Sequence, residues 1–276
     1  MIVELFKALI LPGRRDKYIS RILCNFAADH PDFLISACKA AGITAVQFKY
    51  LGKYPVLLDV RGRSITEGVL SRGSFQFELF EVIQRIYSRR DVCFVNVGAN
   101  IGTTCLNAHA LGFRDIIAFE PVQGNFSLLE TNLAGLGVDL RRQAVGETSG
   151  RAAINLNLSS IGRHSFVKDF GNGNEEVEVV RLDDVLPKRP GFLWIDTEGF
   201  ELSVLRGATN YLANYAEGIC IEVTPQLIAS DAVATVDQIL TQHFSRFYTA
   251  RGEILNGFDL VRELADGEQR DFIALK

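Results

Sequence analysis

Two glycines and an acid follow two short apolar runs of the chain. Gly98 comes directly after the run 92–97, with Gly102 four residues further on, and Glu120 comes directly after the run 116–119. Glycines at the end of a parallel strand let a ligand lie against the main chain, and the helix that follows offers free N–H groups. An acid about twenty residues further on is placed to accept hydrogen bonds from ribose hydroxyls. The spacing therefore predicts an adenosine site.

The glycine pattern narrows the choice of adenosine ligand. Nicotinamide and flavin sites normally show G-x-G-x-x-G, in which the second glycine admits the pyrophosphate, whereas this chain has G-x-x-x-G. The chain also lacks the P-loop pattern G-x-x-x-x-G-K-[ST]. A ligand without a pyrophosphate fits better, although a turn that only lets a helix pack on the sheet would use the same glycines.

Acidic side chains crowd after a third apolar run, 192–195. Asp196 and Glu198 follow this run, and ligands of open α/β sheets collect outside the carboxyl ends of strands. A carboxylate there can remove the proton of an alcohol. Glu201 is better explained as a cap, because negative charge is favourable at a helix N-terminus. Together with Glu222, Asp196 and Glu198 could instead gather Mg²⁺, but their spacing is not diagnostic and we expect no metal.

Two further groups are weaker candidates. His164, in the loop 159–165, could act as an imidazole base, whereas the other three histidines fit helix or surface positions. Gln143, Ala144 and Val145 end a strand on the side where adenine is expected, and an ordinary strand end would look the same.

Five blocks of sequence, taken in order, resemble the FkbM-type S-adenosylmethionine-dependent methyltransferases. The blocks are Asn96–Gly102, Phe119–Pro121, Leu182–Asp184, Ile195–Ala208 and Ile221–Val223. The resemblance extends over roughly 75–223. It implies a class I methyltransferase fold, S-adenosylmethionine as cofactor, and transfer of a methyl group, usually to oxygen.

The resemblance and the glycine turn together define the expected site. The expected cofactor contacts are Asn96, Gly98, Ala99, Asn100, Gly102, Thr103, Glu120, Pro121, Gln143, Ala144, Val145 and Asp196, and the expected catalytic residues are Asp196, His164 and Glu198. The chain departs from the family at two places. Asn96 stands where the family generally has Asp, and Trp194 stands where it often has Lys. An amide can bond to the cofactor's ammonium group but cannot pair with it by charge.

The order of elements predicts one α/β domain with an extension. We expect a small α+β extension over 1–74 and a methyltransferase domain over 75–276, with a mostly parallel seven-stranded sheet flanked by helices. The expected strands of this domain are 92–97, 115–119, 138–145, 152–157, 176–181, 192–195, 217–223, 245–250 and 271–275. The expected helices are 75–89, 102–111, 122–134, 200–214 and 231–243. The extension is expected to hold helical residues over 16–41, strands at 45–50 and 55–60, and turns around Gly62, Gly68 and Gly73.

Composition limits the partners and the compartment. The net charge is −4 and no basic run occurs, which argues against nucleic acid as the substrate. Five cysteines without C-x-x-C indicate reduced core residues and a cytoplasmic protein. No apolar run is long enough for a transmembrane segment. Residues 1–12 fit an amphipathic helix that packs on its own domain or docks on a membrane or partner.

The sequence does not identify the methyl acceptor. We expect a small-molecule or glycan acceptor, with sugars, polyketide hydroxyls, glycolipids and peptides all compatible, and a homo-oligomer is compatible too. Specificity should reside in 1–74 and 157–176, since loops usually carry it. A non-catalytic S-adenosylmethionine-binding scaffold and a nicotinamide-dependent oxidoreductase are also compatible with the sequence.

Overall fold

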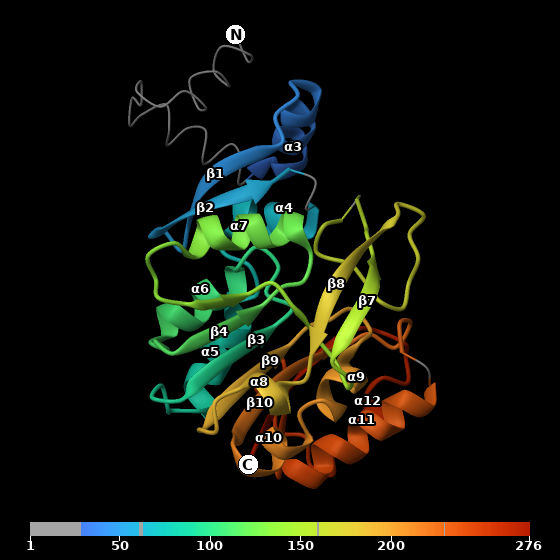
Figure 1. Ribbon diagram of the computed structural model, residues 1–276. Helices are drawn as coiled ribbons and strands as arrows, with labels where there is room; N and C mark the ends of the chain where they lie inside the picture. The colour runs from blue at the N-terminus through green and yellow to red at the C-terminus, as the bar shows by residue number, and fades with distance from the viewer. Residues whose placement is uncertain (1–28, 61–62, 159, 229) are drawn as a thin grey trace. The chain divides into compact units, whose positions relative to one another are not determined.

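The structure is a computed structural model that describes residues 29–60, 63–158, 160–228 and 230–276 (Figure 1). The chain divides into two compact units, one ending at Phe75 and the other spanning Gln76–Lys276. The predicted helix over 1–12 and the first half of the helical segment 16–41 lie outside the described residues. Within the described residues, no helix is both long and apolar enough to cross a bilayer.

The first unit is a hairpin with two helices. Its elements are α3 (Pro31–Ala40), β1 (Ala45–Tyr50), β2 (Tyr54–Asp59) and α4 (Arg63–Arg72). The structure confirms the predicted helix start at Pro31. Proline suits the first turn of a helix, because the N–H that it lacks would have no partner there. The turns expected around Gly68 are wrong, since α4 runs through that residue. A Cβ at Gly68 would crowd the Phe75 ring, which explains a glycine inside this helix.

The second unit is built on a seven-stranded sheet, as predicted. Its strand order is β11-β12-β10-β9-β3-β4-β5, with only the pairings of β12 antiparallel. The strands are β3 (Cys93–Val97), β4 (Ile116–Phe119), β5 (Asp139–Arg141), β9 (Gly191–Ile195), β10 (Ala216–Val223), β11 (Arg246–Thr249) and β12 (Arg270–Leu275). The direction of strand succession reverses between β3 and β9, and ligands collect at such a switch point.

Helices cover both faces of this sheet (Figure 1). They are α5 (Phe77–Ile86), α6 (Thr103–Leu111), α7 (Gln123–Leu133), α8 (Leu182–Val185), α9 (Glu201–Arg206), α10 (Thr209–Asn214), α11 (Ser230–His243) and α12 (Leu260–Glu263). Odd-numbered residues of β3 and β9, such as Val95 and Leu193, pack with α9 to α11. Even-numbered residues face the other way, where Trp194 stacks on Phe80 of α5 with ring centroids 4.8 Å apart. Trp194 is thus a core residue.

Two predicted elements are each split in the structure. The expected strand 138–145 is β5 in the large sheet and β6 (Ala144–Val145) in a three-stranded sheet with β7 (Gly150–Asn155) and β8 (Asn174–Val180). The expected helix 200–214 breaks into α9 and α10 at Gly207. A Cβ at Gly207 would overlap the carbonyl oxygen of Gly146, so the break brings these two backbones together. A tertiary contact therefore overrides the helical pattern.

Candidate active site

The glycine turn after β3 presses against the end of β9. Gly98 has a φ of +86°, and a Cβ there would overlap the carbonyl oxygen of Asp196. Gly102 has a φ of +95° and precedes α6, with the side chains of α7 close behind it. Both glycines are therefore required by backbone conformation and by close approach. The contact between Gly98 and Asp196 joins the two halves of the expected site at the switch point.

Glu120 lies behind this turn, as a strand-end acid should. It is buried, and its two carboxylate oxygens accept the backbone N–H groups of Asn100, at 2.9 Å, and Val122, at 3.0 Å. Asn125 also bonds to the carboxylate. Burial raises the pKa of Glu120 to about 7, although these hydrogen bonds oppose the shift.

Two buried amide oxygens beside the turn have no hydrogen-bond partner among the described residues: Oδ1 of Asn96 and Oδ1 of Asn100. Nδ2 of Asn96 lies 3.4 Å from the Cys105 sulfur on α6, and Nδ2 of Asn100 donates to the Ile161 carbonyl at 3.3 Å. Buried acceptors normally find a donor. Ribose hydroxyls and an ammonium group are donors, so these residues fit an adenosine ligand that carries an amino group.

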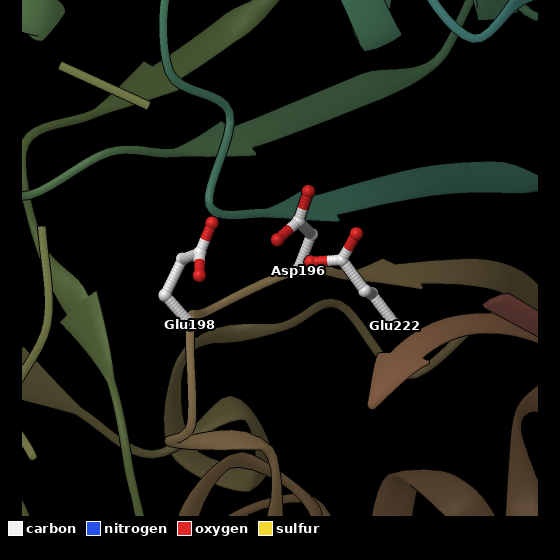
Figure 2. Close-up of side chains that lie close together, drawn as sticks. All are labelled: Asp196, Glu198 and Glu222. Carbon is white, nitrogen blue, oxygen red and sulfur yellow. The ribbon is translucent and has the colours of Figure 1, made fainter. Parts of the chain in front are cut away.

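Four acidic side chains, Asp196, Glu198, Glu222 and Asp271, lie at the sheet edge next to this turn and are called the acid row below. Ile195 of β9 pairs with Ile221 of β10, so the residues that follow, Asp196 and Glu222, lie side by side. Glu222 pairs in turn with Asp271 on the antiparallel strand β12. Neighbouring strands lie about 4.8 Å apart, which brings three carboxyl groups onto one face. Figure 2 shows Asp196 between Glu222 and Glu198, and oxygens of these three residues lie within 4.8 Å of one another.

Three of these acids, Asp196, Glu198 and Asp271, have raised pKa values and hold their protons more tightly than exposed carboxyl groups do. Burial, and then the Glu222 charge, raises the pKa of Asp196. The same two causes raise the pKa values of Glu198 and Asp271 to about 7. Asp196 and Glu222 share a hydrogen bond, which requires a proton on one of them. The row can therefore hold and exchange protons near neutral pH, and its oxygens are also suitable donors for a hard divalent cation.

Glu198 occupies a strained turn. Its φ of +51° lies in the left-handed region, which is unfavourable for a non-glycine residue. Glu201 supports this turn, because its Oε1 accepts the N–H groups of Thr197 and Gly199 at 3.2 and 3.0 Å. These bonds go to residues before α9, so Glu201 fixes the turn that leads into the helix rather than capping the helix itself. The guanidinium of Arg163 lies 3.8 Å from the Glu198 carboxylate.

His164 is engaged in a structural bond. Its Nδ1 accepts the backbone N–H of Asn157 at 2.9 Å, and burial lowers its pKa to about 4. The proton of the neutral ring is then on Nε2, which can donate but cannot take a proton. The carboxylates therefore support the role of base better than His164 does.

The remaining expected contacts are less direct. Ala144 and Val145 are buried in the hydrophobic core on β6, whereas Gln143 is half-buried between β5 and β6. Pro121 is half-buried after Glu120, and Thr103 is buried in the first turn of α6. Thr103 is the first residue of α6, and the prediction that a helix start offers free N–H groups to the ligand applies there.

Two residues of the site were not found from the sequence. Asp271 reaches the acid row only through strand pairing between distant segments. Asn125 donates to the carbonyl of Ile161 at 2.9 Å, which fastens the loop around 161 beside Glu120. The apolar run 272–275 indicates a strand that begins near Asp271, but it carries no signal for the neighbours of that strand on the sheet.

The chain is similar in sequence to known methyltransferases. The model of the methyltransferase FkbM domain family matches residues 96–247. The hexuronic acid methyltransferase AglP of Haloferax volcanii is 30% identical over 125 residues, which cover 42% of this chain and 50% of that protein. The chain thus spans about half the length of this curated relative.

A solved structure shares the fold. The FkbM methyltransferase from Methylobacillus flagellatus KT superimposes with a TM-score of 0.50 at 16% sequence identity, over 79% of this chain and 56% of that one. At this level of identity the likeness concerns the fold, which is the predicted class I methyltransferase arrangement.

Proposed function

Because the chain belongs to the FkbM methyltransferase family, we propose that it transfers a methyl group from S-adenosylmethionine to a hydroxyl of a small-molecule, sugar or glycolipid acceptor. The observation that carries the proposal is the close contact of Gly98 with Asp196. It places a turn suited to adenosine directly against a row of carboxyl groups.

The residues of the turn bind and orient the cofactor in this proposal. Glu120 accepts bonds from the ribose hydroxyls, and Oδ1 of Asn96 accepts one from the ammonium group. Bound S-adenosylmethionine supplies an electrophilic methyl group. Holding donor and acceptor in line contributes much of the rate by itself.

In this proposal the acid row accepts the hydroxyl proton of the methyl acceptor. An ionised Asp196 or Glu198 accepts the hydroxyl proton, and the partner carboxyl of Glu222 stabilises the change by sharing a hydrogen bond. A base whose pKa lies near the working pH is the most effective, and the pKa of Glu198 is raised to about 7. The hexuronic acid named for the curated relative makes a sugar hydroxyl or a sugar carboxyl a natural first acceptor to test.

The decisive experiment incubates the protein with S-adenosylmethionine labelled in the methyl group and with fractionated glycan, lipid and metabolite extracts. Label should enter one fraction and survive alkali, because methyl ethers are stable where methyl esters are hydrolysed. The Asp196→Asn variant serves as the control. Release of label by alkali would identify a carboxyl acceptor, and a comparison of transfer with added Mg²⁺ and with a chelator tests whether the acid row needs a metal.

Calorimetry with S-adenosylhomocysteine distinguishes a methyltransferase from a non-catalytic binding protein and from an oxidoreductase. Binding without transfer to any fraction would favour a non-catalytic S-adenosylmethionine-binding protein. Absence of binding, with a nicotinamide cofactor raising the melting temperature instead, would overturn the proposal.

A further inference from the structure

A cavity of about 230 Å³ opens beside the turn that carries Glu198. Its lining includes Gly199 and Phe200 at the start of α9, together with Val167, Leu227, Ile228 and Ala232. None of these residues belongs to the expected cofactor or catalytic set.

The cavity and the acid row share one turn of the chain. Ser165 donates its hydroxyl to the Glu198 carbonyl at 2.7 Å, and the Phe166 ring lies 4.6 Å from the Phe200 ring. Gly199 packs so closely on Leu227 that a Cβ there would approach the Leu227 Cβ to 2.7 Å. A molecule in the cavity therefore lies against the residue that follows Glu198.

The cavity lining is mainly apolar. Its polar members satisfy one another, since Ser203 accepts the Glu147 N–H at 3.0 Å and Arg206 pairs with the Glu147 carboxylate at 3.4 Å. Val167 is 55% exposed, so the lining includes an apolar side chain that is open to solvent. Burying such surface favours an apolar ligand group.

The size selects a small group. An apolar cavity of about 150 Å³ can hold benzene, whereas pockets for drug-sized ligands begin near 300 Å³. A cavity of about 230 Å³ thus accommodates one ring or a short branched alkyl group.

We propose that this cavity binds an apolar ring or short alkyl group carried by the methyl acceptor, while the hydroxyl of the same molecule reaches the acid row. The inference rests on the proposed function, because it presupposes an acceptor. It selects acceptors with an apolar substituent over free sugars.

The test uses benzyl alcohol as a probe. Saturation-transfer NMR measures its binding in the presence of S-adenosylhomocysteine. Ala232→Phe fills the cavity from α11, and Ala234→Phe adds the same group at an exposed position of the same helix. Benzyl alcohol should bind the wild type and Ala234→Phe equally, and bind Ala232→Phe at least about tenfold more weakly.

Absence of benzyl alcohol binding to the wild type, or equal binding to both variants, would overturn the inference. Calorimetry with S-adenosylhomocysteine on all three proteins keeps the two proposals apart. Unchanged cofactor affinity in Ala232→Phe shows that the variant is folded and that only the cavity is filled. Failure of the wild type to bind S-adenosylhomocysteine would remove the proposed function and leave the cavity result to stand for an apolar ligand alone.

Discussion

Cofactor affinity should depend on pH through Glu120. Burial raises the pKa of this carboxyl to about 7, and ribose hydroxyls donate to its ionised form. Proton and cofactor therefore compete in the proposed site, so binding should strengthen as the pH rises through 7. At pH 6 only about a tenth of Glu120 is ionised, which makes the expected affinity about tenfold lower than at pH 8.

The perturbation that isolates this effect is Glu120→Gln. The amide keeps one acceptor oxygen and has no charge, so the variant should lose about 1.5–3 kcal/mol of binding free energy at pH 8, or about 10- to 150-fold in affinity. The affinity that remains should no longer follow the titration of residue 120. Glu130→Gln, which removes the same charge from an exposed position of α7, should bind like the wild type.

The assay is calorimetry with S-adenosylhomocysteine at pH 6, 7 and 8, in buffers of different ionisation enthalpy so that proton release is counted directly. An affinity of the wild type that is constant over this range would refute the reasoning. So would a pH dependence that persists unchanged in Glu120→Gln, because it would assign the proton to Asp196 or Glu198 instead.

The stability of the cofactor-free protein should change in the opposite direction. An acid with a pKa raised by folding favours the folded state while it is protonated, and this contribution is lost as the pH rises from about 4.5 to about 7. Glu120→Gln should flatten that part of the curve of unfolding free energy against pH, measured by urea denaturation.

Three further predictions concern the remaining site residues. Asp196→Asn should lower kcat about 10²–10⁴-fold and change S-adenosylhomocysteine affinity much less, and equal losses in both would assign Asp196 to binding only. His164→Ala should cost about 1 kcal/mol of unfolding free energy for the lost bond to Asn157 and keep the acid limb of the pH–rate profile, whereas a vanished limb would restore the imidazole as base. Gly98→Ala should cost more than about 3 kcal/mol or prevent folding, while Gly124→Ala, in open space on α7, should stabilise by about 0.5–1 kcal/mol; equal denaturation midpoints would contradict the close contact.

The glycine turn was predictable because its information is local. The run 92–97, the two glycines and Glu120 lie within about thirty residues of one βαβ unit, where strand period, turn residues and offset agree. The structure joins Asn100 and Glu120 by a direct hydrogen bond, which brings the glycine turn and the strand-end acid together, although the sequence pattern does not specify this bond.

The acid row was only partly predictable because it depends on strand pairing. Asp196 could be found because it follows a predicted strand. Asp271 joins it only through the register of β10 against β12, which neither segment specifies by its own sequence. The break at Gly207 has a similar cause, because the residue it touches, Gly146, is distant in the sequence.

The left-handed backbone of Glu198 also bears on how this protein responds to selection. A left-handed non-glycine residue costs roughly 1–2 kcal/mol, and a buried carboxyl among like charges adds to the cost. Glycine at this position would relieve both and remove the carboxyl group. A screen for heat resistance alone should therefore enrich Glu198→Gly, whereas a screen for turnover should remove it. At residue 198, selection for thermostability and selection for activity favour different amino acids.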